Sequence, residues 1–372
     1  MKIGLDARLW NETGVGRYIR NLVLNLQEID RENQYVLFVL SKDFMDVQSS
    51  IVNGRWSIVT TDIHWHTIQE QIDFPKILYK ENLDLVHFPY FSVPVGYKRP
   101  FVVTIHDLIL HHFPTGKAST LPMPFYYAKQ LAYRFVIARA AEKAKKIITV
   151  SHATGKQIEK DLHVPKEKIV VTYEGVDKKI SSIQYPISKS QYPYFLYVGN
   201  AYPHKNLERL MYAFEIFRHN GFNAKLILVG KEDFFYKRLK KLIHGLTIAH
   251  DVLFEHEVTD EQLTNLYAHA SALVIPSLME GFGLPGLEAM SKNCLVLASR
   301  IVSLEEIYKD ACLYIDPFSV TDIADGLEKI YTMSQGERET LQEKGQQQVK
   351  KFSWSTMAAQ THAVYESCIS LR

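Results

Sequence analysis

The stretch ALVIPSLMEGFGLPGLEAM, residues 272–290, passes from an apolar run through a glycine-rich loop into the start of a helix. Its first part, ALVIPS (272–277), is apolar on consecutive positions, which is typical of a strand buried on both faces of a parallel sheet. Pro285 suits the first turn of the helix that follows the loop. A strand, a loop and a helix in this order predict an α/β fold.

The same alternation of short apolar runs and longer amphipathic segments extends along almost the whole chain. The first series of runs is KIGL (2–5), YVLFVL (35–40), WSIVT (56–60), LDLVHFP (83–89), FVVTIHD (101–107), KIITVS (146–151) and IVVTYEG (169–175). The second series is YFLYVGN (194–200), AKLILVG (224–230), VLFEHE (252–257), ALVIPS (272–277), CLVLAS (294–299) and ACLYID (311–316). Between them lies a polar segment with two prolines, KKISSIQYPISKSQYP (178–193), which we expect to be a linker.

Two separate series argue for two doubly wound, Rossmann-like domains rather than one large sheet. We expect an N-terminal domain over 1–185, a C-terminal domain over 190–354 and a terminal helix over 355–372. Two such domains in tandem leave a cleft between the carboxyl ends of both sheets, where α/β folds bind ligands. The loops that follow the strands are therefore expected to carry the chemistry.

Composition sets the class of protein. The chain has 372 residues, 47% of them hydrophobic and 23% charged, with a formal net charge of +2. Its cysteines, Cys294, Cys312 and Cys368, match no metal or redox spacing and predict buried thiols in a reducing compartment. An acid at Asp6 comes too early for a signal peptide, and no apolar run reaches the ~20 residues of a membrane span. We therefore expect a cytoplasmic protein.

The opening stretch also contains G-x-G-x-x-G (Gly281, Gly283 and Gly286), the spacing of a nicotinamide-binding loop. That loop follows the first strand of its domain, whereas here the preceding strand is the fourth. Glycines before a helix still suit a diphosphate, because the first N–H groups of a helix lack partners. Glu280 could then accept hydrogen bonds from sugar hydroxyls and Glu288 could hold a ribose. The alternative is a helix N-terminus carrying stabilising acids.

Three further motifs follow strands. In VGNAYPHKNLERL (198–210), Lys205 lies just before a helix and could bind phosphate, although it could also be an ordinary surface lysine. In TGVGRY (13–18), two glycines either approach a ligand or form a plain turn. In FVVTIHDLILHHFP (101–114), His106 ends a buried strand and could donate to a hydroxyl or phosphate. The adjacent histidines lack the spacing of a zinc site, so no metal is expected.

The segment 117–146 is locally basic. It holds seven basic residues against one acid, and Tyr126, Tyr127, Tyr133 and Phe135 are interleaved with them. This composition fits either a face that contacts an anionic membrane or a solvated helix face. Nucleic acid is not expected, because the basicity is local and no DNA- or RNA-reading motif accompanies it.

Taken together, these motifs resemble the family-4 retaining glycosyltransferases. EGFGLPGLE (280–288) is similar to the E-x7-E signature of that family. The other motifs that follow the family's order are TGVGRY, HFPYFSVP, VVTIHDL, VSHATGKQI and YVGNAYPHKNL. The resemblance implies the GT-B fold, in which two Rossmann-like domains face each other across a cleft and the last helix crosses back to the first domain. It also implies an N-terminal acceptor domain and a C-terminal donor domain.

The resemblance further implies residue roles. The catalytic positions would be His106, Lys205 and Glu280, and the donor-binding positions would be Gly14, Gly16, Asn200, Lys205, Gly281, Phe282, Gly283, Leu284 and Glu288. Glu288 would bind the ribose, Lys205 the leaving diphosphate, and His106 the donor sugar. Many relatives place an Arg in the loop of Lys205, where this chain has Asn200 and His204. Arg17 or backbone dipoles would have to replace that charge.

The implied reaction is transfer of a hexose from a nucleoside diphosphate sugar with retention at the anomeric carbon, without a metal. TGVGRY with VVTIHDL resembles bacterial enzymes of O-antigen and capsule assembly, many of which are mannosyltransferases that use GDP-mannose. The acceptor would be a glycan or a lipid-linked sugar, which fits a peripheral location on the inner face of the cell membrane. The alternatives are a nucleotide-sugar epimerase, an NAD-dependent enzyme, and a catalytically silent protein that binds nucleotide sugars.

Overall fold

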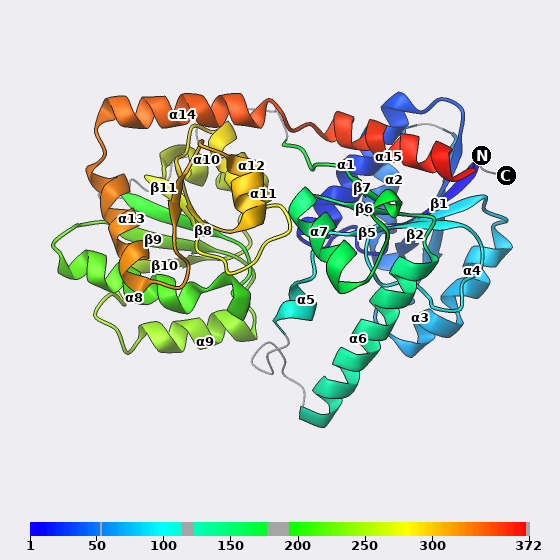
Figure 1. Cartoon of the computed structure of the whole chain (residues 1–372), viewed down its shortest axis with the longest axis horizontal. Coiled ribbons are helices and arrows are strands. Elements are labelled where there is room, and N and C mark those ends of the chain that lie inside the picture. Colours follow the sequence, from blue (N-terminus) through cyan, green and yellow to red (C-terminus); the bar gives the residue numbers. More distant parts are fainter. Residues whose placement is uncertain (53, 114–122, 177–192, 370–372) are drawn as a thin grey trace. The chain divides into compact units, whose positions relative to one another are not determined.

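The structure is a computed structural model that describes residues 1–52, 54–113, 123–176 and 193–369 (Figure 1). The chain divides into two compact units. Unit 1 comprises Met1–Gly175 and Ser353–Arg372, and unit 2 comprises Val176–Phe352. The linker expected at 178–193 lies outside the described residues except for Pro193.

Unit 1 is built on a parallel sheet with the strand order β3-β2-β1-β4-β5-β6-β7. Its strands are β1 (Lys2–Asp6), β2 (Gln34–Leu40), β3 (Trp56–Thr61), β4 (Leu85–Phe88), β5 (Phe101–Ile105), β6 (Lys146–Thr149) and β7 (Ile169–Val171). Its helices are α1 (Gly14–Ile29), α2 (Phe44–Ser50), α3 (Ile68–Ile72), α4 (Phe74–Lys80), α5 (Ile109–His112), α6 (Met123–Lys143), α7 (His152–Asp161) and α15 (Trp354–Ile369), with 3-10 turns at Ser41–Asp43 and Lys166–Lys168.

Unit 2 repeats this plan with the order β10-β9-β8-β11-β12-β13, again all parallel. Its strands are β8 (Tyr194–Val198), β9 (Lys225–Val229), β10 (Val252–Glu255), β11 (Ala272–Ile275), β12 (Val296–Ser299) and β13 (Leu313–Ile315). Its helices are α8 (Leu207–His219), α9 (Phe234–Ile243), α10 (Asp260–His269), α11 (Leu284–Ser291), α12 (Val302–Tyr308), α13 (Val320–Thr332) and α14 (Gln335–Val349), with a 3-10 turn at Pro203–Lys205.

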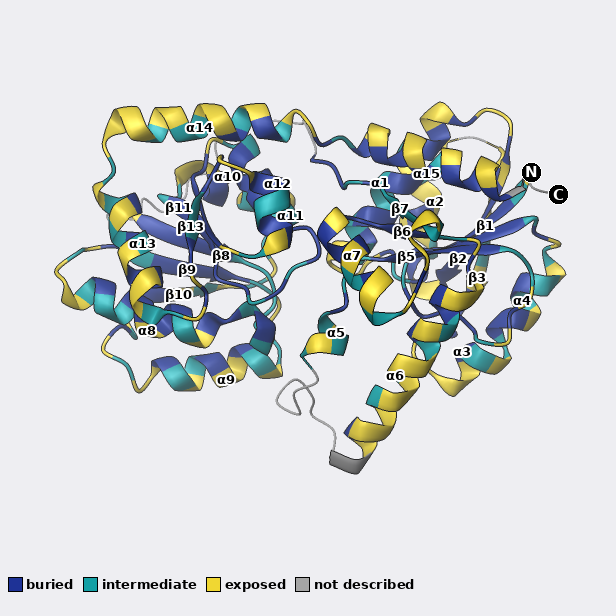
Figure 2. Cartoon of the chain, in the orientation of Figure 1, coloured by how far each residue is buried: buried dark blue, intermediate teal, exposed yellow. Residues whose placement is uncertain are grey.

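Each apolar run of the sequence contains a strand, so the prediction of two parallel α/β domains is confirmed. The expected burial on both faces holds for the interior strands: β4, β5, β11 and β12 are buried along their full lengths. It is wrong for the strands at the edges of the sheets, β3, β7, β10 and β13, which contain exposed or half-buried residues. An edge strand has a neighbour on one side only, so helices cover it less completely (Figure 2).

In both sheets the strand order reverses beside the first strand. In unit 1, β1 lies between β2 and β4, and in unit 2, β8 lies between β9 and β11. Connections leave in opposite directions at such a point, so the loops after these strands diverge and leave a crevice at the carboxyl edge. This edge is where ligand contacts are expected in each unit.

Helices flank both faces of each sheet and supply the rest of the cores (Figure 1). In unit 2, α8 and α13 pack together over the sheet and bury Leu210, Phe214 and Leu327 completely. In unit 1, α15 packs along α1 and also reaches β4 and β6. Cys294, Cys312 and Cys368 are buried free thiols.

Candidate active site

The loops that follow β8 and β11 in unit 2 meet through an ion pair. Lys205 Nζ lies 2.7 Å from Glu280 Oε1 and 2.9 Å from Glu280 Oε2. Ser277 Oγ donates a 2.6 Å hydrogen bond to the same carboxylate. The side chains of Lys205 and Glu280 remain 18% and 12% exposed, so both charges can be reached from solvent. The structure thus brings together two of the three predicted catalytic residues.

The surroundings of Glu280 keep it ionised. Burial would by itself raise the pKa of Glu280, but the Lys205 ammonium and the hydrogen bonds from Lys205 and Ser277 outweigh burial and lower this pKa. The neighbouring His204 is buried, and burial together with the Lys205 charge lowers the pKa of His204 to about 4. The ring of His204 is therefore neutral at pH 7, and Lys205 is the cation that faces Glu280.

Asn206 ties three loops of this site together, which the sequence did not reveal. Its side-chain amide donates to the carbonyl of Pro276 at 2.9 Å and to that of Pro317 at 2.7 Å. Its backbone is left-handed, with φ of 62°, a conformation that Asn tolerates better than most residues. The turn chemistry of Asn before a helix was the signal available. Arg209 donates to the side-chain amide oxygen of Asn206 at 2.8 Å and so brings a second cation to this loop.

Packing also requires glycine at two positions of the E-x7-E loop. Gly283 has φ of 88°, and a Cβ there would lie 2.4 Å from the hydroxyl of Tyr308. A Cβ at Gly286 would lie 2.3 Å from Tyr308 Cζ. The Tyr308 hydroxyl donates to the Gly283 carbonyl. Gly283 and Gly286 therefore leave the room that Tyr308 of α12 needs to pack against the loop. Gly281 is buried within the loop.

Helix α11 begins at Leu284 with Pro285 in its first turn, as predicted. Its first N–H groups have no partner inside the helix. Glu288 lies one turn further on and accepts a 3.2 Å hydrogen bond from Tyr267, which the sequence analysis did not single out. The side chain of Phe282 packs edge-on against Phe352, so only its backbone is suited to a ligand.

The remaining predicted residue of unit 2, Asn200, begins the loop between β8 and Lys205. Its carbonyl accepts a 2.6 Å hydrogen bond from Tyr197, and its side chain accepts from the backbone of Tyr202 at 3.4 Å. The preceding Gly199 has φ of 149°, and its carbonyl accepts a 2.7 Å hydrogen bond from Tyr236. These contacts shape the loop that carries Lys205.

In unit 1, His106 follows β5 and both of its ring nitrogens have neighbours. Nε2 lies 3.0 Å from the carbonyl oxygen of Pro89, and Nδ1 lies 3.4 Å from Glu174 Oε1. Tyr18 packs edge-on against the ring at 4.8 Å. Glu174 is not among the predicted site residues; its place near the end of the run 169–175, shortly after β7 at the carboxyl edge of the sheet, was the available signal.

The two glycines of TGVGRY differ. Gly14 is the first residue of α1, is exposed, and has no atom within 4 Å of the position a Cβ would take. Gly16 is buried, and a Cβ there would lie 2.5 Å from the carbonyl oxygen of Trp10. Gly16 is thus required by packing, whereas Gly14 leaves open space beside the helix start. Arg17 is also on α1, in unit 1.

Helix α6 presents apolar side chains to solvent. Tyr127, Leu131 and Phe135, spaced four residues apart and so on one face of the helix, are 59%, 69% and 62% exposed. Lys129 and Arg134, both exposed, are interleaved with them. The helix extends away from the sheet of unit 1 (Figures 1 and 2). The two interpretations of segment 117–146, a face that contacts a membrane and a solvated helix face, both stay predictions, and Lys117 lies outside the described residues.

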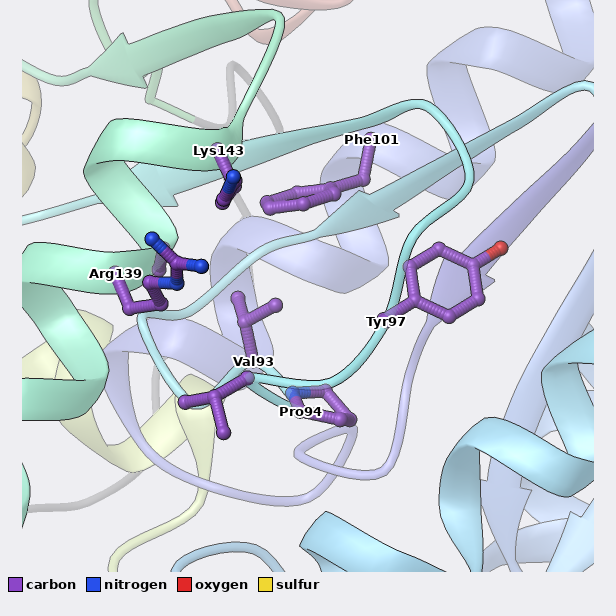
Figure 3. Close-up of a pocket in the computed structure, with 8 residues that line it drawn as sticks. Val93, Pro94, Tyr97, Phe101, Arg139 and Lys143 are labelled. Carbon is purple, nitrogen blue, oxygen red and sulfur yellow. The ribbon is translucent and has the colours of Figure 1, made fainter.

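A small pocket lies where α6 meets the loop before β5 (Figure 3). Its lining residues are Val93, Pro94, Val95, Tyr97, Phe101, Arg139, Ala140 and Lys143. None of them is a predicted site residue. The Tyr97 hydroxyl is buried with no hydrogen-bond partner among the described residues, but it points away from Arg139 and Lys143. The pocket therefore offers no charged or polar group that converges with the hydroxyl on one ligand.

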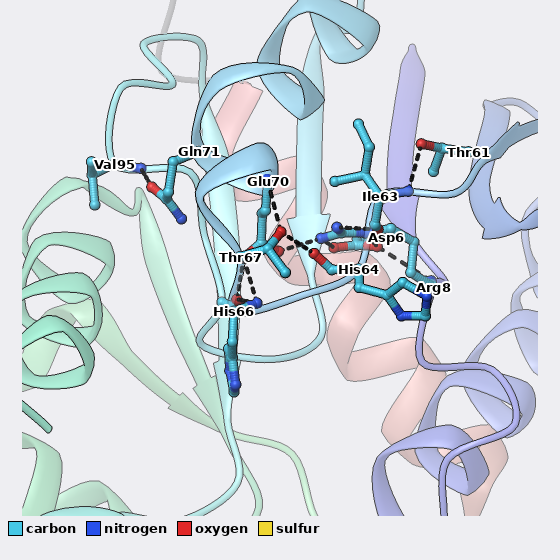
Figure 4. Close-up of polar contacts among 11 residues, drawn as sticks. Asp6, Arg8, Thr61, Ile63, His64, His66, Thr67, Glu70, Gln71 and Val95 are labelled. Carbon is cyan, nitrogen blue, oxygen red and sulfur yellow. Dashed lines mark hydrogen bonds and ion pairs between the residues drawn. The ribbon is translucent and has the colours of Figure 1, made fainter. Parts of the chain in front are cut away.

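Beside β1, unit 1 holds a buried ionic network (Figure 4). The Arg8 guanidinium donates to Asp6 at 2.7 and 2.8 Å, to Glu70 at 2.6 Å and to the Ile63 carbonyl at 3.0 Å. Ser92 donates to the second oxygen of Glu70 at 2.6 Å. Burial would lower the pKa of Arg8, but the carboxylates of Asp6 and Glu70 hold it above its ordinary value. The network joins the loops that follow β1, β3 and β4.

Over the described ranges, no group of three or more His, Cys, Asp or Glu side chains is arranged to hold a metal ion. Within the same ranges, none of the helices has both the length and the apolar character to cross a membrane.

Known proteins resemble this chain over nearly all of its length. Residues 13–179 match the family described as Glycosyltransferase Family 4, and residues 180–348 match Glycosyl transferases group 1. An O-antigen chain mannosyltransferase B of Escherichia coli is 31% identical over 76% of this chain and 74% of its own length. The O-antigen chain mannosyltransferase RfbU of Salmonella typhimurium is 26% identical over 82% and 83%.

Among solved structures, the Anabaena protein HepE in complex with UDP-glucose matches with a TM-score of 0.76 at 15% identity, over 99% of this chain and all of the other. This similarity supports the fold alone. The two parallel-sheet units of this chain are those of the GT-B fold, as the sequence predicts.

Proposed function

This chain belongs to the family-4 glycosyltransferases, and from that premise we propose that it transfers mannose from GDP-mannose to a glycan or lipid-linked acceptor in cell-surface polysaccharide synthesis. The named activities of its relatives in Escherichia coli and Salmonella typhimurium support the choice of sugar. The observation that carries the site assignment is the solvent-accessible pair of Lys205 and Glu280 beside the start of α11.

In the proposed donor complex, Lys205 exchanges its partner. In the free protein its ammonium is paired with Glu280 at 2.7 Å. A diphosphate at the N-terminus of α11 offers Lys205 a more highly charged acceptor, with the helix N–H groups adding to the attraction. Glu280 is then released to accept hydrogen bonds from sugar hydroxyls. Glu288, one turn into the helix, is suited to the neutral diol of the ribose.

The proposed transfer retains the anomeric configuration and uses no protein nucleophile. Glu280 is assigned to hydroxyl binding rather than to attack. Rate enhancement would come from stabilising the charge that develops on the leaving diphosphate, an electrostatic effect of preorganised donors. Lys205 and the amides of Gly283 and Leu284 supply that charge in unit 2, so the proposed reaction needs no metal. His106 in unit 1 would hydrogen-bond to the donor sugar.

A product assay tests this function. The purified protein is incubated with GDP-mannose, UDP-glucose and dTDP sugars and a lipid-linked acceptor, with and without EDTA. We expect transfer from GDP-mannose, an unchanged rate in EDTA, and an anomeric proton of the product that matches the configuration of the donor. In parallel, thermal unfolding is followed with GDP, UDP, dTDP and NAD. Stabilisation by NAD alone, with no sugar transfer, would falsify the proposal.

We also propose that unit 1 contacts an anionic membrane surface through α6. Exposed rings and leucine on one face, with lysine and arginine beside them, are the features of helices that lie in a membrane interface. Each basic residue near an anionic surface adds roughly 1 kcal/mol of attraction. A lipid-linked acceptor would make such a contact useful, because the enzyme would be held at the surface that contains its substrate.

Vesicle sedimentation tests the membrane contact. We expect the protein to sediment with vesicles that contain phosphatidylglycerol and to remain in solution with purely zwitterionic vesicles. Replacing Tyr127, Leu131 and Phe135 together by Ser should abolish binding while transfer to a soluble acceptor persists. The matched control is Phe234→Ser, which removes an exposed ring from unit 2. Equal sedimentation of the triple variant and the wild type would contradict the assignment to α6.

A further inference from the structure

The loop that carries Lys205 is held by two buried tyrosines. The Tyr197 hydroxyl donates a 2.6 Å hydrogen bond to the carbonyl of Asn200, and the Tyr236 hydroxyl donates a 2.7 Å hydrogen bond to the carbonyl of Gly199. Burial raises the pKa of both hydroxyls, so each keeps its proton at neutral pH and acts as a donor. Since one tyrosine lies on β8 and the other on α9, two consecutive carbonyls of the loop are fixed from separate elements.

Two glycines leave the room that these hydroxyls need. A Cβ at Gly199 would lie 2.9 Å from the Tyr197 hydroxyl. A Cβ at Gly230, directly after β9, would lie 2.4 Å from the Tyr236 hydroxyl and 2.2 Å from the Gly199 carbonyl oxygen. The Tyr236 hydroxyl also lies 3.2 Å from the Val229 carbonyl, which already accepts a 2.9 Å hydrogen bond from the Gly199 N–H. The shorter bond from Tyr236 therefore goes to the loop.

Fixing the two carbonyls also fixes the direction of two N–H groups. Both tyrosine rings belong to the hydrophobic core of unit 2, so the carbonyls that they bind point into the core. In a trans peptide the N–H points away from the C=O of the same peptide unit, so the N–H groups of Asn200 and Ala201 point out of the core. Both residues are half-buried, and within the described part of the chain neither N–H donates to a protein acceptor.

We propose that Tyr197 and Tyr236 are positioning residues that shape this loop for the diphosphate of the donor, and that the N–H groups of Asn200 and Ala201 contact it beside Lys205. The inference rests on the proposed function, in which Lys205 binds the diphosphate. Consecutive N–H groups on one side of a loop are suited to an anion, and fixed amide dipoles need no reorganisation when it binds. They supply part of the attraction expected from the arginine that this loop lacks.

Amide NMR with inorganic pyrophosphate tests the contact without any sugar. In protein labelled with nitrogen-15 alanine, the Ala201 signal is identified by its absence in Ala201→Ser. We expect pyrophosphate and GDP to move the Ala201 amide proton downfield, as a hydrogen bond to an anion does, and guanosine to leave it in place. The downfield shift should be lost in Tyr197→Phe and in Tyr236→Phe. A wild-type signal that neither pyrophosphate nor GDP moves would overturn the inference, whether or not the variants fold.

Calorimetric titration then tests the role of the tyrosines. Tyr197→Phe and Tyr236→Phe keep the ring and remove the donor, and each should weaken GDP and pyrophosphate by the same factor, about 10-fold, as for one hydrogen bond to a charged group. Tyr194→Phe is the matched control, because Tyr194 is also buried on β8 and its hydroxyl donates to the Leu266 carbonyl at 2.8 Å. It should leave both affinities unchanged. Wild-type affinities in both tyrosine variants, or an equal loss in the control, would overturn the positioning role.

The proposed function and this inference fail in different experiments. If the wild-type protein transfers no sugar from any nucleotide donor but pyrophosphate moves the Ala201 signal, the proposed function fails and the anion site in the loop stands. If the protein transfers mannose and both tyrosine variants bind GDP as the wild type does, the proposed function stands and the positioning role fails.

Discussion

Each unit places a cation in the loop after its first strand and pairs it with a carboxylate from another loop or helix, but the two pairs are buried to different extents. In unit 1, Arg8 follows the first strand, and its side chain and that of Glu70 are 1% and 0% exposed. In unit 2, Lys205 follows the first strand, and it and Glu280 are 18% and 12% exposed. The buried pair cannot reach a ligand without unfolding its surroundings, whereas the accessible pair can exchange partners. The same topology thus fixes loops in one unit and leaves a solvent-accessible ion pair in the other.

The choice of cation agrees with this difference. The planar guanidinium of Arg8 makes four hydrogen bonds to two carboxylates and a carbonyl, which hold three loops in one geometry. The ammonium of Lys205 is a compact charge on a flexible stem, and it contacts one carboxylate. A flexible point charge can move to a phosphate more readily than a guanidinium that is held by four hydrogen bonds. The two cations should therefore respond differently to substitution.

The largest effect on stability is expected from Arg8→Met. Removing the guanidinium leaves Asp6 and Glu70 buried without their cation, and breaking a buried pair from one side costs about 3–5 kcal/mol. Urea unfolding of the variant measures this loss. The control is Lys76→Met, which removes an exposed pair with Asp73 in the same unit and should change stability by less than about 1 kcal/mol. If Arg8→Met loses no more stability than Lys76→Met, the buried pair of unit 1 is not structural and does not differ in this way from the Lys205–Glu280 pair of unit 2.

For Lys205→Ala we expect a large loss of activity and a small loss of stability. Loss of one group that stabilises the leaving charge lowers kcat by about 10²–10³. Stability should fall far less than in Arg8→Met, because water can solvate the carboxylate of Glu280 once its partner is gone. Steady-state kinetics and urea unfolding on one preparation test both halves. Full activity, or unfolding as severe as that of Arg8→Met, would show that the pair in unit 2 is structural.

The glycine-containing loops of the two units differ in the space around their glycines. Gly286→Ala places a methyl group 2.3 Å from the ring of Tyr308, and overpacking of this kind costs about 1–3 kcal/mol. Gly14→Ala meets no atom within 4 Å and should leave stability unchanged or slightly raised. Thermal unfolding compares the two. A drop in donor affinity for Gly14→Ala at unchanged stability would support a ligand contact there, and equal destabilisation of both variants would contradict the packing argument.

The smallest effect concerns pH. The pKa of His204 in the folded protein is about 4, below the ordinary value near 6.5, so the unfolded chain binds more protons between these values. The stability due to neutral His204 is therefore complete above pH 6.5 and is lost as the pH falls towards 4. Between pH 6.5 and 5.5 the loss is about 1 kcal/mol.

In His204→Gln, the urea midpoint of unfolding should change less with pH in this window than it does in the wild type. A wild-type slope that persists unchanged in the variant would assign the pH dependence to other groups, such as the buried His87 of unit 1.

Much of the fold could be predicted, because parallel strands are buried and leave continuous apolar runs in the sequence. All the expected runs contain strands, and Pro285 marks the first turn of α11 as predicted. The edge strands were misjudged, since their composition resembles that of interior strands while their burial depends on neighbours. The positions of Lys205, Glu280 and Glu288 could be predicted as site candidates, but the roles assigned to them stay predictions.

The class of fold, the two-domain plan and the family can be inferred from the sequence alone, because they follow from the period and order of local patterns. Tertiary structure decided which charges meet: Arg8 with Glu70 across 62 residues, Lys205 with Glu280 across 75, and His106 with Glu174 from a different loop. It also decided that Gly283 and Gly286 make room for Tyr308. Side chains far apart in sequence find one another only when sheet order brings their loops to one edge, and no local pattern records that proximity.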